Sequence, residues 1–375
     1  MKGATSICTI IIVTLLLLAS AKATAQPAST NQPSSLVTLK RIPPVQMGNS
    51  ILISPDGKMI ATLRGEGTSW NSGGKPLHLQ VWEVRKGDLL WTARERALYL
   101  FAFSPDGKHL VGIAEDTTLA FWDTTNRRVK SRLRKKNLPV SAAAFLPDGR
   151  TLVTTVTRWG NSSPMQPIAG ELQLWGAKTG RFNHALKAQT NAISALAVSP
   201  DGSTLAIANE FHGFANTVNI LDIATDSVRH TLRFGTNVWM ISSKAFSPDG
   251  KTLAAEGGAE INRKGEVRLW DVSSGKLKRS ITEADVGAAP IAPIWWGSHV
   301  AFFPDGEVLA IMGENHRIDL WSVADNKWRG SFGYSDPPDL GRYVIQFVPE
   351  GLLLAGVNRF QQVEVKLWNH KGKDG

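Results

Sequence analysis

The chain has 375 residues, of which 42% are hydrophobic and 20% are charged. This composition supports a sizeable hydrophobic core and excludes an intrinsically disordered protein. The only cysteine is Cys8, so the chain beyond residue 25 has no thiol for a disulfide, a metal site or a nucleophile.

The first 25 residues have the pattern of a secretory signal peptide. A positively charged second residue precedes an apolar run at 10–18, and small residues at 23–25 form a cleavage site before Gln26. The apolar run is short for a bilayer span, although an uncleaved membrane anchor is the alternative. We expect residues 26–35 to be a flexible leader, with no membrane span after cleavage. An exported chain without disulfides fits the bacterial periplasm or exterior.

A four-residue turn motif then recurs along the chain. Copies or close variants of Ser-Pro-Asp-Gly (SPDG) begin at Ser54, Ser104, Leu146, Ser199, Ser247 and Phe303, and a divergent copy begins at Val348. Each copy lies between two short apolar-rich runs, for example 99–103 and 108–113. Two such runs around a tight polar turn predict a β-hairpin, because proline presets the turn and glycine supplies a positive φ.

A second landmark follows each turn at the end of an alternating run. It is a tryptophan in six repeats and a leucine in the fourth: Trp82, Trp122, Trp175, Leu221, Trp270, Trp321 and Trp368. A residue that tolerates a left-handed backbone comes next, and a further short strand follows it. These residues are Gly87, Asn126, Gly180, Asp226, Gly275 and Asn326.

One repeat therefore contains four strands, and the turns recur every 42 to 56 residues. This period predicts an all-β, seven-bladed β-propeller with four antiparallel strands per blade. The sequence resembles the WD40-repeat family at FSPDGK (103–108), FWD (121–123), FSPDGK (246–251) and RLWDV (268–272). The resemblance covers residues 36–375 and implies a propeller that acts as a binding platform.

The chain departs from the family at one feature. The Gly-His dipeptide before the first strand is missing from every repeat, and Asp116, at the place of the family's inter-strand aspartate, has no matching histidine. We therefore expect packing of tryptophan and aliphatic side chains between blades to stabilise the ring instead.

The two ends of the chain predict how the ring closes. After Trp368 too few residues remain for an outer strand, whereas residues 36–42 provide a spare strand before the first repeat. We expect this N-terminal strand to complete the last blade, which removes an open sheet edge.

The repeats also predict two different ends of the propeller. We call the end with the SPDG turns and the post-tryptophan turns the turn face, and the opposite end the loop face. The longer connections all belong to the loop face: 64–77, 157–170, 209–216, 256–264, 283–297 and 333–341. Variable loops on one face of a rigid scaffold commonly carry function.

Surplus aromatic residues in or beside these connections define a candidate binding face. Its members are Trp70, Trp159, Phe211, His212, Trp239, Trp295, Trp296 and Tyr334. We interpret them as a surface for a protein, peptide or glycan. The alternative is that the rings fill the mouth of the central channel or hold their own loops.

No catalytic motif is recognisable, so we expect a non-enzymatic protein without metal or cofactor, and we expect the SPDG aspartates to be structural. A periplasmic hydrolase or lyase at the channel mouth is the alternative, built from His212 and loop-face carboxylates. Those carboxylates are Glu66, Glu210, Glu256, Glu260, Glu283, Asp285, Asp336 and Asp339.

Basic residues concentrate in the predicted outer strands, for example Arg127, Arg128, Lys130, Arg229 and Lys278. Cations on an edge strand prevent edge-to-edge pairing. The alternative is a basic rim for an anionic polymer. Together these features predict a monomeric, exported interaction module.

Overall fold

The computed structural model describes sixteen stretches of the chain, and every structural statement below concerns them. They are 36–42, 51–64, 77–133, 140–159, 167–190, 193–209, 217–234, 240–258, 265–282, 284–286, 297–298, 300–312, 318–332, 343–348, 351–357 and 363–368. Within them the chain forms strands only, and no helix is long and apolar enough to cross a membrane.

The strands group into seven blades, each numbered from the inside of the ring outward. Blades one and two contain β2 (Ile51–Ile53), β3 (Met59–Arg64), β4 (Leu77–Glu83), β5 (Leu89–Phe103), β6 (His109–Ala114), β7 (Leu119–Asp123) and β8 (Arg128–Arg132). Blade three contains β9 (Val140–Phe145), β10 (Thr151–Trp159), β11 (Pro167–Gly176) and β12 (Arg181–Thr190). Blade four contains β13 (Ile193–Val198), β14 (Thr204–Asn209), β15 (Thr217–Asp222) and β16 (Ser227–Arg233).

The remaining blades repeat this arrangement. Blade five contains β17 (Met240–Phe246), β18 (Thr252–Gly258), β19 (Gly265–Asp271) and β20 (Leu277–Ile281). Blade six contains β22 (Val300–Phe302), β23 (Val308–Met312), β24 (Ile318–Ser322) and β25 (Lys327–Phe332). Blade seven contains β26 (Tyr343–Val348), β27 (Gly351–Val357), β28 (Val363–Trp368) and β1 (Leu36–Ile42).

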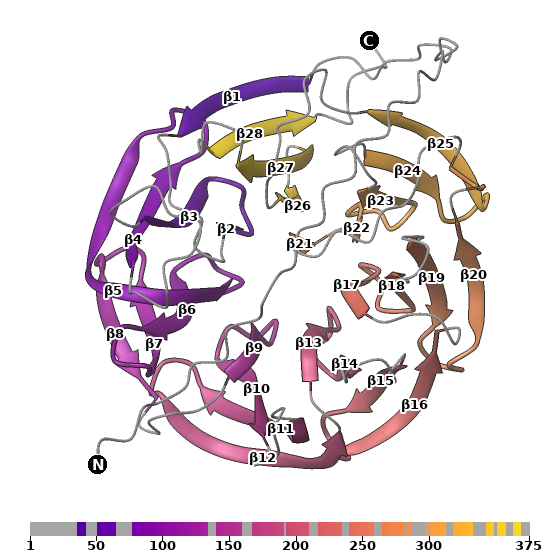
Figure 1. Cartoon of the computed structure of the whole chain (residues 1–375), viewed down its shortest axis with the longest axis horizontal. Helices are drawn as coiled ribbons and strands as arrows, with labels where there is room; N and C mark the ends of the chain where they lie inside the picture. The colour runs from indigo at the N-terminus through magenta and orange to yellow at the C-terminus, as the bar shows by residue number, and fades with distance from the viewer. Residues whose placement is uncertain are drawn as a thin grey trace, which may run out of the picture.

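The blades form a closed ring, and the N-terminal strand closes it (Figure 1). β1 pairs antiparallel with β28, with Leu36 opposite Trp368 and Ile42 opposite Val363. Across the closure, Gln346 Nε2 donates a hydrogen bond to the Ser54 carbonyl at 3.0 Å. The predicted closure by residues 36–42 is confirmed.

Two features of the ring differ from a plain set of four-stranded blades. β5 runs without a break from the outer position of blade one to the inner position of blade two, where Ala97 pairs with both Leu77 and Ala114. Residues 89–103 contain no glycine or proline to interrupt it. In addition, β21 (Gly297–Ser298) pairs in parallel with β26 and adds a fifth strand to blade seven.

The SPDG turns form the predicted hairpins. In the first, the Gly57 amide donates to the Ser54 carbonyl at 2.8 Å, and Gly57 has a φ of 70°. The Ser54 hydroxyl donates to Asp56 Oδ1 at 2.6 Å and accepts from the Met59 amide at 2.9 Å. The serine and aspartate side chains therefore form hydrogen bonds with each other and with the backbone of the turn.

The outer turns also follow the prediction, with one correction. Gly87, Gly180, Asp226, Gly275 and Asn326 all have positive φ values. In blade two, however, the left-handed residue is Arg127, at 59°, and the prediction of Asn126 was wrong. Every left-handed residue lies five positions after its tryptophan or leucine, and Arg127 holds that position in blade two.

The hydrophobic core lies between blades rather than at one centre. The aliphatic side chains of neighbouring blades pack together, and the landmark tryptophans of blades one, two, three, five and six are nearly inaccessible; Trp122, for example, is 0% exposed. In blades one and three the indole nitrogen donates to a threonine of the second strand, from Trp82 to Thr62 and from Trp175 to Thr154, both at 3.0 Å. The expected packing between blades is thus observed.

Each landmark residue also pairs with an apolar residue of the outer strand, and in blades one to six a β-bulge lies directly beside the pair. The pairs are Trp82–Leu89, Trp122–Val129, Trp175–Phe182, Leu221–Val228, Trp270–Leu277, Trp321–Trp328 and Trp368–Leu36. Five of these outer residues are well exposed, such as Phe182. Because such a pair recurs in blades one to six, the exposed side chains are explained as the outer cover of the buried landmarks.

Candidate functional site

The turn face of the propeller is held together by hydrogen bonds between its inner and outer turns. In six blades the backbone amide two residues after the landmark tryptophan or leucine donates a hydrogen bond to the carbonyl of the residue that directly follows the SPDG turn. Examples are Val84 to Lys58 at 2.9 Å and Val272 to Lys251 at 3.0 Å. The inner and outer turns of a blade are thereby joined at one end of the ring. The turn face is a rigid set of short connections.

The aspartates of the turn face are structural, as predicted. Asp201 accepts hydrogen bonds from the Ser199 hydroxyl and the Ser203 amide, and these bonds hold its pKa below the ordinary value. The corresponding bonds from Ser247 and Lys251 lower the pKa of Asp249 in the same way. These carboxylates stay ionised at neutral pH and have little capacity for acid–base chemistry.

The predicted aromatic binding face belongs to the other end, and its side chains lie outside the described residues. The backbone of Trp159 ends β10 opposite Pro167, which places this residue at the start of a loop-face connection. The other predicted members, Trp70, Phe211, His212, Trp239, Trp295, Trp296 and Tyr334, fall in stretches beyond those described. Their grouping into one surface therefore stays a prediction.

Two of the loop-face carboxylates considered for catalysis are within the described residues. Glu256 is fully buried in β18. Asp285 accepts hydrogen bonds from the amide and the hydroxyl of Thr282, both at 2.9 Å, and pairs with Arg279. Although partial burial raises the pKa of Asp285, these contacts outweigh it and hold the pKa below its ordinary value. Asp285 is thus part of a structural turn.

Asp116 has a comparable structural role in the short loop-face connection of blade two. Its Oδ1 atom accepts from the Thr118 amide at 3.1 Å and the Thr118 hydroxyl at 2.5 Å, and pairs with Arg132 at 2.9 Å. It organises this tight turn without a histidine. Over the stretches that the structure describes, no group of three or more potential ligands could hold a metal ion.

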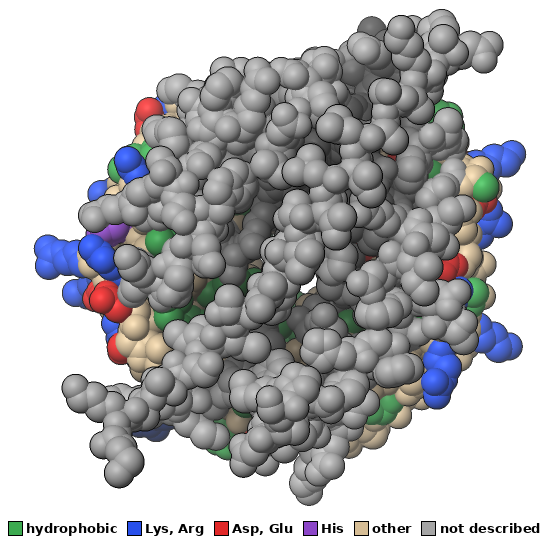
Figure 2. All heavy atoms as spheres, viewed as in Figure 1, with side chains coloured by type: hydrophobic (Ala, Val, Ile, Leu, Met, Phe, Trp, Pro, Cys, Tyr) green, Lys and Arg blue, Asp and Glu red, His purple; other side chains and the backbone are tan. Residues whose placement is uncertain are grey.

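The outer edge of the ring is the second candidate surface. Lysine and arginine side chains project from this edge on both sides of the view in Figure 2. On β8 and the turn before it, Arg127, Arg128 and Lys130 are exposed, as the sequence predicted. Lys178 and Arg181, in the outer turn of blade three, are exposed beside them and were not singled out from the sequence.

His109 lies beside this basic surface and contacts one of its lysines. Lys130 Nζ donates a hydrogen bond to His109 Nε2 at 2.9 Å, which requires that this ring nitrogen carry no proton. Burial and the charge of Lys130 lower the pKa of His109, and Lys178 acts in the same direction. A protonated His109 would place another positive charge in the cluster, so the neutral ring is favoured.

Comparison with known proteins agrees with this geometry. No family model matches the chain. The chain is 24% identical over 238 residues to apoptotic protease-activating factor 1 of Rattus norvegicus, covering 64% of this chain. It is 24% identical over 285 residues to the WD repeat-containing protein WDS homolog of Arabidopsis thaliana, covering 74% of this chain. It is 22% identical over 260 residues to the transcriptional corepressor LEUNIG_HOMOLOG of Arabidopsis thaliana, covering 60%.

The matched regions are only parts of these relatives, namely 17%, 48% and 30% of their respective lengths. Antiparallel four-stranded blades in a ring define the class of the protein as an all-β propeller. The chain is, more particularly, a distant relative of the WD40-repeat proteins.

Proposed function

We propose that this chain is an exported, non-enzymatic scaffold that holds a protein or peptide partner on its loop face. The observation that supports the proposal most directly is the difference between the two ends of the ring. The turn face consists of short connections whose polar groups bond to one another. The longer connections, with their aromatic residues, belong to the loop face. Such loops are free to carry recognition because the blades do not need them for their pairing.

The relatives favour a protein or peptide as the partner, because their names describe components that act through other proteins. A glycan is the other ligand class that an aromatic-rich loop face suits. The proposal of export to the bacterial cell envelope depends on residues 1–25. It is tested by cell fractionation and by N-terminal sequencing of the recovered protein, which should begin at Gln26.

The binding proposal is tested by affinity capture from an envelope extract followed by mass spectrometry. The wild-type chain is compared with a variant carrying Trp70→Ala, Trp159→Ala and Trp295→Ala. The matched control is Phe182→Ala, which removes an exposed aromatic ring from the outer edge. We expect the triple variant to lose partners that the wild type and the control retain. An unchanged set of partners in the triple variant would exclude the aromatic loop face as the binding surface.

A further inference from the structure

The net charge of the chain is concentrated in one stretch. Residues 124–200 contain 12 lysine and arginine residues but only two acidic residues, Asp148 and Glu171, a net charge of +10. The whole chain also has a net charge of +10, so acidic and basic residues balance everywhere else. In the ring this stretch runs from the outer turn of blade two to the first strand of blade four. The excess charge therefore belongs to one sector of the propeller.

Packing between blades two and three brings part of this charge together. A Cβ atom on Gly180 would lie only 2.7 Å from the Arg132 carbonyl oxygen, so the outer turn of blade three lies directly against β8. Lys178 and Arg181 belong to that turn, and Lys130 belongs to the strand beneath it. We define the rim patch as Arg127, Arg128, Lys130, Lys178 and Arg181, which are all exposed.

The charges of the rim patch are not neutralised within the protein. Among the described residues, none of its five members forms an ion pair with a carboxylate. Other cations of the outer strands are paired, including Arg132 of β8 itself. The pairs are Arg132–Asp116, Arg229–Asp222, Lys278–Asp271 and Arg279–Asp285, and Arg329–Asp325. Paired cations protect a strand edge as well as unpaired ones, so edge protection alone does not explain the excess.

The backbone at Arg127 gives an independent sign that the patch has a use. Arg127 has a φ of 59°, whereas the equivalent position in the other five described outer turns holds glycine, aspartate or asparagine. A left-handed backbone costs an ordinary residue about 1 kcal/mol relative to glycine or asparagine. Glycine or asparagine at this position would make the turn more stable. Backbone strain of this kind is common at functional surfaces, which agrees with a role of the Arg127 side chain in recognition.

We propose that the rim patch binds an acidic segment of a protein partner. This inference rests on the proposed function of the chain as a protein scaffold, and it adds a second contact surface on the outer edge. Arginine pairs with carboxylates through two parallel hydrogen bonds, and an electropositive surface accelerates the approach of an acidic partner. The partner class follows from charge complementarity at this one junction.

The extent of the patch favours a short protein segment over a long anionic polymer. β8 contains five residues and spans about 17 Å. Acidic and basic residues balance over the rest of the chain, so a nucleic acid or an acidic polysaccharide would gain little from the rest of the rim. Apolar residues also lie next to these cations in the chain, Val129 beside Arg128 and Lys130 and Phe182 beside Arg181, and Phe182 is 52% exposed. A protein segment that mixes acidic and apolar residues suits this pattern.

The test measures binding of a fluorescein-labelled peptide of about twelve residues, composed of Asp, Glu and Leu, by fluorescence anisotropy at about 0.15 M NaCl. The variant Arg128→Gln/Lys130→Gln/Lys178→Gln is compared with the control Arg233→Gln/Lys276→Gln/Lys327→Gln. Both lose three exposed cations that form no ion pair among the described residues. We expect the first variant to weaken binding at least about tenfold and the control to stay within about twofold of the wild type. An equal loss in both would show attraction by bulk charge and overturn the proposal.

Arg127→Asn provides a second readout. We expect weaker peptide binding together with higher thermal stability, because the arginine contributes to recognition but strains the turn. A purely structural residue would leave binding unchanged, which would contradict the proposal. Single-stranded DNA and polygalacturonate of matched charge serve as competitors. Tighter binding of either polymer than of the peptide would also overturn it.

Failure of this inference is distinguishable from failure of the proposed function. The loop-face variant with three tryptophans replaced should bind the acidic peptide as the wild type does. If that variant keeps all captured partners while peptide binding depends on the rim patch, only the loop-face proposal falls. If the rim variant binds the peptide normally while the loop-face variant loses its partners, only the rim proposal falls.

Discussion

The junction between blades two and three and the junction between blades four and five share one backbone design. In each, a glycine with positive φ lies in the outer turn of the later blade and seats that turn on the outer strand of the earlier one. A Cβ on Gly180 would be 2.7 Å from the Arg132 carbonyl, and one on Gly275 would be 2.7 Å from the His230 ring. Small residues are needed at both positions because the turn and the strand approach so closely.

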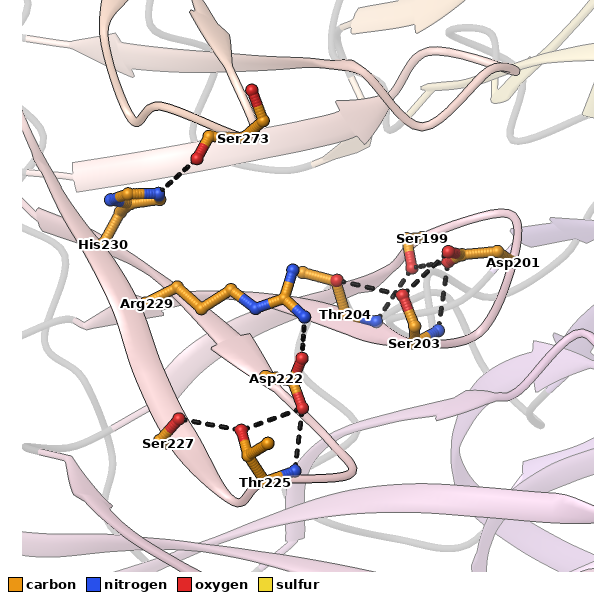
Figure 3. Close-up of polar contacts among 10 residues, drawn as sticks. All are labelled: Ser199, Asp201, Ser203, Thr204, Asp222, Thr225, Ser227, Arg229, His230 and Ser273. Carbon is orange, nitrogen blue, oxygen red and sulfur yellow. Dashed lines mark hydrogen bonds and ion pairs between the residues drawn. The ribbon is translucent and has the colours of Figure 1, made fainter.

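The polar groups at the two junctions differ. At blades four and five, His230 Nε2 donates to the Ser273 carbonyl at 2.8 Å, and Arg229 pairs with Asp222 (Figure 3). At blades two and three, Lys130 instead donates to His109 and Arg132 pairs with Asp116, whereas the five cations of the rim patch form no ion pair among the described residues. The fold thus determines how the backbones meet, whereas the side-chain charges can differ from one junction to the next. Function can evolve at such a position without altering the ring.

The largest expected effect comes from opening the ring, which should weaken both junctions alike. Deleting residues 36–42 removes the strand that covers β28 and exposes its edge. We expect the melting temperature to fall by about 10 °C or more. Differential scanning calorimetry measures the change. A melting temperature within error of the wild type would show that β1 does not close the ring in solution.

Alanine substitutions of Gly180 and Gly275 should destabilise the two junctions to different extents. Gly180→Ala places its new methyl group against backbone, which cannot move aside, and we expect a loss of about 3 kcal/mol. Gly275→Ala meets the His230 ring, so the loss should be smaller, about 2 kcal/mol. Adding His230→Ala should recover part of the loss at Gly275. Urea unfolding measures all three, and equal losses with no recovery would contradict the difference in contacts.

A reciprocal exchange tests the strain at the outer turns. Arg127→Asn should stabilise the protein by about 1 kcal/mol, because asparagine tolerates the left-handed backbone at φ 59°. Asn326→Arg, at φ 57° in blade six, should destabilise it by a similar amount. Thermal denaturation of the two variants provides the measurement. If both changes have the same sign, backbone strain is not the controlling term.

The smallest expected effect is a pH dependence of the free energy of unfolding that arises at the junction of blades two and three. The folded pKa of His109 is lowered by burial and by Lys130, whereas the unfolded ring has its ordinary value of 6.5. The unfolded chain therefore binds a proton more readily, and stability falls as the pH drops from about 6.5 toward the folded pKa. We expect a loss of about 0.5 kcal/mol between pH 7.5 and 5.5 because the ring is partly solvated.

The nearby acids Asp106 and Asp123 oppose this shift. His109→Gln should remove the dependence, and urea midpoints of the wild type and the variant at both pH values provide the comparison. A wild-type midpoint that rises on acidification would contradict the assigned direction.

Much of the fold could be predicted because its determinants are local and repeat. The SPDG turns require particular residues at particular φ values, and the tryptophans end alternating strands at a regular spacing. Residues 36–42 could be assigned to the last blade because they form a spare strand before the first repeat. The continuity of β5 and the pairing of β21 with β26 were not predicted, because no turn residue or hydrophobic period marks them.

The candidate sites also differ in how far they could be predicted from the sequence. The aromatic loop face stays a prediction from sequence, because its side chains lie outside the described residues. The sequence by itself showed seven repeats, their turns, and the basic residues of the outer strands. Only the tertiary structure brought Lys178 and Arg181 to β8 and placed Lys130 beside His109. It also showed that Arg127, rather than Asn126, has the left-handed backbone in the outer turn of blade two. The physical reason is that turns and strands are set by neighbours in the chain, whereas the rim patch is formed by residues about 50 positions apart that meet through packing of adjacent blades.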